Sequence, residues 1–265
     1  MLNTIVVTTA LPLGFSSFVT NVGVKDTTKD FTVVMADGPC SAAGVFTQSR
    51  FAGPSVVISR RNVANLSAQA VVVISKNANV ATGEEGMRHA EEVTSSVAAA
   101  LGLNSSEVLI ASTGVIGRLY PIDNIRAGIA SLPFPLPNND ADDVARGIMT
   151  TDTVHKISSA TITGSTARVV GVAKGVGMIE PNMATLIAMV FTDAKVESQK
   201  LNDIFRGVIN KTLNCVSVDT DTSTSDTAIV LASGAAGTVD DAALTEALHT
   251  VLLDLTKAIA RDGEG

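Results

Sequence analysis

Short runs of β-branched and other apolar residues recur along the chain, and they constrain the fold more than any other feature of the sequence. Runs of this length, rich in valine and isoleucine, are typical of strands, several of them buried on both faces of a sheet. The predicted strands occupy residues 5–9, 31–35, 44–47, 55–59, 70–75 and 108–112 in the first half and residues 167–173, 185–192 and 227–232 in the second.

Helices are predicted between these runs. The clearest begins after Thr82, where Glu85 lies three residues later and can complete a capping box, and it ends at Gly102. Further helices are predicted in the segment that follows the proline-rich loop at 132–143 and ends near Met149, and at 201–213 and 244–259. Strands mixed with helices predict an α/β fold, in the sense of an α+β layered domain.

The composition excludes several classes of partner. Of the 265 residues, 46% are hydrophobic and 17% are charged, which is typical of a globular protein. The net charge of −7 argues against nucleic acid as a partner, because phosphate binding requires clustered lysine and arginine. No apolar run is long enough to span a membrane, so we expect no membrane partner. The apolar N-terminal segment lacks a basic start, and we interpret it as a strand and loop rather than a signal peptide.

The cysteines and histidines do not indicate a metal or cofactor site. Cys40 and Cys215 lack metal-ligand spacing, so we expect two buried structural thiols and a cytoplasmic location. The three histidines are scattered, which argues against zinc. The oxygen-rich run at 219–227 fails as a calcium-binding loop, because Thr224 and Val230 replace the required glycine and glutamate. This run favours a hydrogen-bonded turn beside a site instead, and we predict neither metal nor cofactor.

The segment GVGMIEPNMATLI at 175–187 has two interpretations. Thr185 is either an ordinary β-forming residue at the start of a core strand or a nucleophile released by self-cleavage. In the second case its hydroxyl attacks the carbonyl carbon of Ala184 and forms an ester, which water then opens. The freed α-amine, with an ordinary pKa of about 7.7–8.0, can act as general base for the hydroxyl of the same residue. Acyl transfer would then be possible without a histidine.

Acyl transfer also requires hydrogen-bond donors for the oxyanion of the tetrahedral intermediate. Ser112, Thr113 and Gly114 end a predicted strand and open a loop, so a backbone N–H and a hydroxyl could converge there. The alternative interpretation is an ordinary turn at the end of a strand.

An ordered series of sequence blocks resembles the ornithine acetyltransferase family, whose members are also described as bifunctional glutamate N-acetyltransferases. The resemblance runs across the whole chain, and it implies the layered α/β fold of the self-processing DmpA-type aminopeptidases. The blocks are FTQSRFAGPSVV at 46–57, NANVATG at 77–83, IASTGVIGR at 110–118, IMTTDT at 148–153, AKGVGMIEPNMATLIAM at 173–189, VSVDTDTSTSDTA at 216–228 and DGEG at 262–265.

Self-cleavage is the first implication of this resemblance. The scissile bond would join Ala184 to Thr185, and its cleavage would leave an α chain, residues 1–184, and the N-terminal part of a β chain, residues 185–265. Members of the family continue beyond the DGEG block, so we expect the rest of the β chain to be missing here. The resemblance also implies that the α/β heterodimer assembles further, as a heterotetramer.

The resemblance further implies a role for each matching residue. Thr185 would carry the acetyl group, and Thr113 and Gly114 would form the oxyanion hole. Enzymes of this family follow a ping-pong cycle, in which N-acetylornithine acetylates the threonine, ornithine leaves, and glutamate accepts the acetyl group. The positions that would bind substrate are Thr150, Lys174, Thr185 and Glu264, of which the lysine is suited to a substrate carboxylate.

One departure from the family pattern lies in the cleavage block. Glu180 stands where many arginine-pathway members have alanine, and this variant resembles the paralogue found in clavulanic-acid gene clusters. Two other functions remain open from the sequence: a self-cleaving amidase or aminopeptidase, with water as acceptor, and an inactive paralogue that binds a small molecule.

Overall fold

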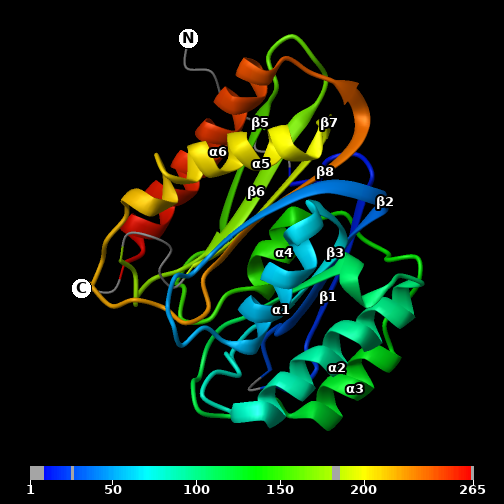
Figure 1. Cartoon of the computed structure of the whole chain (residues 1–265), viewed down its shortest axis with the longest axis vertical. Coiled ribbons are helices and arrows are strands. Elements are labelled where there is room, and N and C mark those ends of the chain that lie inside the picture. The colour runs from blue at the N-terminus through cyan, green and yellow to red at the C-terminus, as the bar shows by residue number, and fades with distance from the viewer. Residues whose placement is uncertain (1–8, 25–26, 181–185, 264–265) are drawn as a thin grey trace.

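A single mixed sheet forms the centre of the protein (Figure 1). The computed structural model describes residues 9–24, 27–180 and 186–263. Within these ranges the sheet has eight strands in the order β4-β3-β2-β8-β7-β6-β5, with β1 paired to β2. The strands are β1 (Phe15–Thr20), β2 (Phe31–Phe46), β3 (Ser67–Ile74), β4 (Val108–Ser112), β5 (Lys156–Thr161), β6 (Arg168–Lys174), β7 (Ile187–Lys195) and β8 (Thr227–Thr238).

The helices connect these strands and cover the sheet. They are α1 (Pro54–Asn62), α2 (Gly83–Leu101), α3 (Ile122–Ala130), α4 (Ala141–Gly147), α5 (Ser198–Ile209) and α6 (Asp241–Arg261), with short 3-10 helices at Val63–Asn65, Ser105–Glu107 and Leu213–Cys215. Figure 1 shows α5 and α6 on one side of the molecule and α2 and α3 on the opposite side.

The long strand β2 joins two halves of the sheet. Its first part pairs with β1 on one edge and with β3 on the other, and its last part pairs with β8. The register of β2 against β3 shifts between Met35 and Cys40, where Gly38 and Pro39 interrupt the ladder. Proline cannot donate a ladder hydrogen bond, so an irregularity at this point is expected. The sequence runs at 31–35 and 44–47, predicted as separate strands, are therefore parts of one strand.

Alternation of side chains along the strands produces layered cores. In β7, Ala188 and Val190 face the core beneath α5 and α6, whereas Met189 and Phe191 face a central core. In β3, Val71 and Val73 face the same central core, and neighbouring residues of that strand face α2. Helix α4 also packs in the central core. The fold is thus a layered α/β arrangement. The inner faces of the two sheet halves share the central core, and helices lie on their outer faces.

The predicted strand at 55–59 is wrong, because these residues lie in α1. Pro54 occupies the first turn of this helix, where its fixed φ is compatible with helix and its missing N–H is not needed. Val57 is exposed between buried neighbours, so the segment buries one helical face rather than both faces of a strand. The predicted strand at 5–9 lies largely outside the described residues.

Two smaller predictions are also corrected. Helix α2 ends at Gly102 in the left-handed conformation, as expected, but the capping box at its start does not form. The Thr82 hydroxyl instead donates to the backbone and side-chain oxygens of Asn79. Cys40 is buried, but Cys215 is exposed, so only one of the two cysteines is a core thiol.

Candidate functional site

The candidate site lies at the sheet edge where β6 ends and where β7 and β8 begin. Lys174, the last residue of β6, pairs with Ile187, the first residue of β7. Ile187 pairs in turn with Thr227, the first residue of β8. Since β6 runs antiparallel to β7 and β8 runs parallel to it, these strand ends meet at one edge. Segments that are distant in the sequence therefore converge there.

A cavity of about 450 Å³ opens at this edge. Thr113, Gly114, Thr150 and Lys174 all line it, although they come from separate sequence blocks. The rest of the wall includes Lys76, the glycine-rich segment that follows β6 and the oxygen-rich turn before β8. The structure thus brings together every predicted site residue that it describes.

Thr113 connects the two sheet halves at the cavity. It follows β4 directly, and its N–H donates to the carbonyl oxygen of Ile74 at 3.1 Å. Lys174 Nζ donates to Thr113 Oγ1 at 3.3 Å, and both residues are only 3% exposed. Because the lysine occupies a lone pair of this oxygen, the hydroxyl proton remains available as a donor to another acceptor.

Gly114 holds a backbone geometry that requires glycine. Its φ is +128°, and a Cβ atom built there would lie 2.3 Å from the carbonyl carbon of Lys76. This close approach is possible only without a side chain. No described residue accepts a hydrogen bond from the Gly114 N–H. A hydroxyl donor and a backbone donor therefore lie on adjacent residues of the cavity wall.

A buried ion network holds loops that line the cavity. Asp152 Oδ1 accepts hydrogen bonds from Lys156 Nζ at 2.8 Å and from Gly175 N at 2.7 Å, and Oδ2 accepts from Thr150 N at 3.0 Å. Lys156 Nζ also donates to Asp262 Oδ2 at 2.5 Å. Burial opposes ionisation of Asp152, but the charge of Lys174 and these hydrogen bonds outweigh it and lower the pKa of Asp152.

Asp226 is a second buried carboxyl group at this edge. It is fully buried, and its Oδ1 accepts a hydrogen bond from Leu186 N at 2.9 Å, while Oδ2 has no hydrogen-bond partner among the described residues. Burial raises the pKa of Asp226 to about 8, against the opposing effects of the Leu186 N–H, the Ser223 hydroxyl and the charge of Lys174. Asp226 is therefore largely protonated at neutral pH.

The oxygen-rich run before β8 forms the hydrogen-bonded turn that the sequence predicted. Asp219 accepts hydrogen bonds from the backbone N–H groups of Met178, Ile179 and Asp221. Burial opposes ionisation of Asp219, but these donors outweigh it and lower its pKa. The turn thus ties the segment after β6 to the segment before β8. In the described part of the chain, no group of three or more His, Cys, Asp or Glu side chains could hold a metal ion.

Three predicted site residues, Ala184, Thr185 and Glu264, lie outside the described residues. Leu186 and Gly263 are their described neighbours, and the Leu186 N–H donates to Asp226, the residue directly before β8. Lys76, Asp152 and Asp226 were not predicted from the sequence. Asp152 and Asp226 lie within the sequence blocks at 148–153 and 216–228. The residues next to them in the sequence are mostly polar, so their burial could not be inferred.

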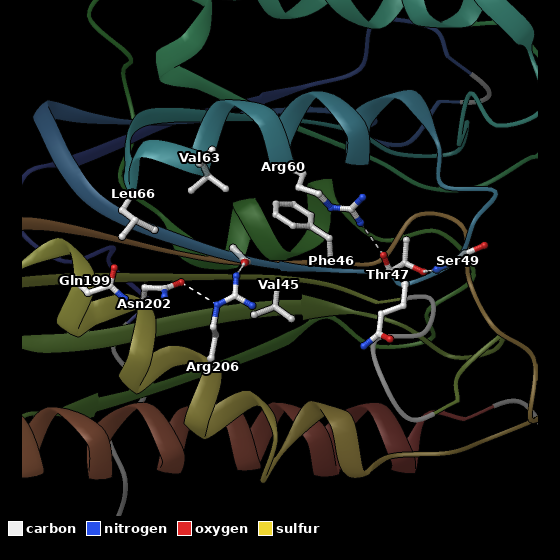
Figure 2. A pocket seen from close by; sticks show the side chains of 13 residues that line it. Val45, Phe46, Thr47, Ser49, Arg60, Val63, Leu66, Gln199, Asn202 and Arg206 are labelled. Atoms are coloured by element: carbon white, nitrogen blue, oxygen red, sulfur yellow. Dashed lines mark hydrogen bonds between the residues drawn. The ribbon is translucent and has the colours of Figure 1, made fainter.

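A second cavity, of about 550 Å³, lies between α1, α5 and the end of β2 (Figure 2). Arg60 donates to the carbonyl oxygen of Thr47 at 2.8 Å, and Arg206 donates to that of Gly44 at 3.1 Å and to Asn202 Oδ1 at 2.9 Å. Both guanidinium groups thus stabilise the end of β2. None of the predicted site residues that the structure describes lines this larger cavity, so we assign the site to the smaller one.

Helices of the described ranges do not combine the length and apolar character that a membrane crossing would require.

The sequence matches known proteins over nearly its whole length. It is 55% identical to the arginine biosynthesis bifunctional protein ArgJ 2 of Nostoc sp., over 96% of this chain and 65% of that protein. It is 51% identical to the glutamate N-acetyltransferase Oat2 of Streptomyces clavuligerus, over 96% of this chain and 64% of that protein. The chain therefore spans less than two thirds of the length of either relative.

Solved structures of other proteins also resemble this chain. The ornithine acetyltransferase of Mycobacterium tuberculosis, complexed with ornithine, matches with a TM-score of 0.56 and 29% identity, over 64% of this chain and 92% of that chain. A β-aminopeptidase of Burkholderia sp. shares the fold alone, with a TM-score of 0.54 and 11% identity, over 94% of this chain and 85% of that chain. The predicted layered α/β fold is confirmed. Since the ArgJ family model matches residues 16–265, the chain belongs to the ArgJ family.

Proposed function

We propose that this protein is an acetyltransferase that moves an acetyl group from N-acetylornithine to glutamate through an acetyl ester on Thr185. The observation that carries the proposal is the Lys174–Thr113 contact beside Gly114, in the cavity at the sheet edge where β7 begins. Family membership and the names of the relatives support the same reaction.

The nucleophile is generated by cleavage of the chain. The Thr185 hydroxyl attacks the carbonyl carbon of Ala184, the C–N bond breaks, and the nitrogen takes up a proton and becomes an amine. Water then hydrolyses the resulting ester, which leaves a carboxylate on Ala184 and a free hydroxyl on Thr185. The amine has an ordinary pKa of about 7.7–8.0, so a substantial fraction is neutral near pH 7.5 and can accept a proton.

The acetyl group is then carried in two steps. The Thr185 oxygen attacks the acetyl carbonyl of N-acetylornithine, while the α-amine takes the hydroxyl proton and passes it to the departing ornithine nitrogen. The amine of glutamate attacks the acetyl ester, and N-acetylglutamate leaves as the threonine hydroxyl is restored. Both tetrahedral intermediates carry an oxyanion, for which Thr113 Oγ1–H and Gly114 N–H are the donors.

Lys174, Thr150 and Glu264 bind the amino-acid part of the substrates in this scheme. Lys174 is a buried cation at the cavity wall and suits the α-carboxylate that N-acetylornithine and glutamate share. Thr150 lines the same cavity. Glu264 follows the segment that Asp262 anchors to Lys156, and its carboxylate suits a substrate ammonium group.

The assembly is proposed on the same basis. An α chain of residues 1–184 and a β chain that begins at Thr185 form a heterodimer, and two heterodimers form a heterotetramer. We place the protein in the cytoplasm, and the free thiols of Cys40 and Cys215 are compatible with that reducing compartment.

Intact-mass measurement of the full-length protein tests the proposal. We expect two fragments separated before Thr185, and a mass increase of one acetyl group on the fragment that begins with Thr185 after N-acetylornithine is added. Thr185→Ala should remain one chain and gain no acetyl group. Glutamate should accelerate release of ornithine; release that is insensitive to glutamate would instead indicate an amidase that uses water. An uncleaved wild-type chain would contradict the proposal.

A further inference from the structure

We propose that Asp226 is a positioning residue for the chemistry at Thr185, and that it acts as a neutral carboxylic acid. This inference rests on the proposed function, because it concerns the same nucleophile. Asp226 has no role in the scheme above, and its fully buried side chain requires an explanation.

The first argument is the hydrogen bond to Leu186. The Leu186 N–H belongs to the peptide group whose carbonyl carbon is that of Thr185. Asp226 Oδ1 accepts from this N–H at 2.9 Å and therefore holds Leu186, the residue that is covalently bonded to the proposed nucleophile. Small errors in the position of a reacting group lower reaction rates strongly, so such a bond contributes to catalysis without touching the substrate.

The second argument is that Asp226 is itself held rigidly. Its backbone carbonyl accepts from Thr47 N at 3.1 Å, and the Thr47 hydroxyl donates to the carbonyl oxygen of Ser223 at 2.6 Å. Thr227, the next residue, pairs with both Ile187 in β7 and Phe46 in β2. The carboxyl group therefore projects from a backbone that three strands hold in place.

The third argument is the unpaired oxygen. Oδ2 of Asp226 is buried and has no hydrogen-bond partner among the described residues. A carboxylate oxygen in that position would be strongly destabilised, whereas a protonated oxygen carries only a neutral O–H donor. The pKa of about 8 agrees with this, because it leaves the group mostly protonated at neutral pH.

The surroundings of Asp226 contain few charges. Thr47 of β2, Leu186 before β7 and Ser223 of the preceding turn are uncharged. Lys174 at the end of β6 is the cation whose field acts on Asp226. Asp219 and Asp221 lie in the same turn and line the cavity. Asp226 therefore supplies a neutral hydrogen-bonding group beside a cation, and ionisation would place a second charge in the buried edge.

The test compares Asp226→Asn, Asp226→Ala and wild type as full-length proteins from cell-free synthesis, with cleavage followed by intact mass between pH 7 and pH 9. Asparagine mimics the neutral acid, because it keeps an acceptor for Leu186 N–H and a donor beside it. We expect Asp226→Asn to cleave within threefold of wild type at pH 7. The rate ratio of Asp226→Asn to wild type should rise about tenfold by pH 9, because only wild type loses the neutral form.

Asp226→Ala should cleave at least tenfold more slowly than wild type at pH 7. A constant Asp226→Asn to wild-type ratio from pH 7 to pH 9 would overturn the inference, even if the alanine variant failed to fold. Alanine cleavage at the wild-type rate would also overturn it. An uncleaved wild type would instead refute the proposed function, and the inference with it.

Asp193→Asn is the matched control. Asp193 is also a buried carboxyl group that accepts backbone hydrogen bonds, from Leu13 at 3.1 Å and Arg168 at 2.7 Å, but it lies towards the opposite end of β7. Its replacement perturbs the fold in a similar way without touching the cavity edge. The rate ratio of Asp193→Asn to wild type should stay constant with pH.

Discussion

At the scale of single residues, the wall of the cavity depends on Gly114. The carbonyl group of Lys76 occupies the space that a side chain would need. The Gly114 N–H donates to no described residue, so in the proposed mechanism it is available to an oxyanion. Gly117 provides a contrast, because it also has a positive φ, of +78°, but nothing lies within 4 Å of a Cβ built there.

We therefore predict that Gly114→Ala displaces the donor and slows acetylation of Thr185 roughly 10²–10³-fold, the usual loss for one oxyanion donor. Rapid-quench mass spectrometry measures this rate. Gly117→Ala should cost about 1–2 kcal/mol of unfolding free energy from backbone strain and leave the acetylation rate nearly unchanged. Equal losses of rate in both variants would show that backbone strain, and not the donor, accounts for the effect.

Lys174 is the second residue for which we predict an effect on activity. It donates to Thr113 and lies in the cavity wall, so its removal loses both an orienting contact and a charge for a substrate carboxylate. A charge-assisted hydrogen bond contributes about 1.5–3 kcal/mol. We predict that Lys174→Gln lowers kcat/KM for N-acetylornithine roughly 10–100-fold. Lys195→Gln, at the exposed end of β7, should retain wild-type kcat/KM in the same assay.

At the scale of elements, strands buried on both faces were the most predictable. The runs at 70–75 and 108–112 match β3 and β4 closely, because β-branched residues fill positions on both faces. The strand β5 was missed, because its sequence KISSAT is largely polar and only half-buried. The helix α1 was misassigned because Val56, Val57 and Ile58 are adjacent, and tertiary packing decided which of them is buried.

Tertiary packing also limited how much of the site could be predicted from the sequence. The sequence predicted Thr113, Gly114, Thr150 and Lys174 as residues of one site, and the fold places them around one cavity, although their roles remain predictions. Asp226 could not be found in this way. It lies in the run DTDTSTSDT, which resembles an exposed turn, and only the pairing of β8 with β7 and β2 buries it.

Lys156 stabilises the contact between three elements. It lies at the start of β5, and it joins the segment before β5 to the end of α6 through Asp152 and Asp262. Its side chain is fully buried, so removal leaves two carboxylates without their cation. We predict that Lys156→Met lowers the unfolding free energy by roughly 3–5 kcal/mol in urea titrations. Lys200→Met removes the exposed ion pair with Asp241, and it should leave the urea midpoint close to the wild-type value.

The pH dependence of this network follows from the lowered pKa of Asp152. A carboxyl group whose pKa is lower in the folded state than in the unfolded state stabilises the fold at pH values above its ordinary pKa, which is about 3.8 for Asp152. This stabilisation is lost as the pH falls through the folded-state pKa. Asp152→Asn should therefore be less stable than wild type at pH 6. The difference should shrink as the pH is lowered below about 3.8. Urea titrations at both pH values measure it, and a difference that grows in acid would contradict the assignment.

At the scale of the whole molecule, the proposed cleavage divides a sheet rather than a linker. Strand β6 belongs to the first fragment and pairs with β7 of the second, and β2 pairs with β8 across the same division. The central core also draws on both fragments. The rings of Phe15 in β1 and Phe191 in β7 lie 5.2 Å apart between their centroids, and Phe191 is fully buried.

This arrangement predicts that the fragments stay together after cleavage. They should elute as one species in native size-exclusion chromatography and separate only in denaturant, because both ladders and the shared core must be broken at once. Phe191→Ala should weaken the association by about 3–5 kcal/mol, the usual cost of truncating a buried phenylalanine, and shift separation to lower urea. Thr185→Ala, which we expect to stay uncleaved, controls for unfolding without dissociation. Elution of the 1–184 fragment alone in native buffer would mean that the two ladders and the shared core do not hold the fragments together.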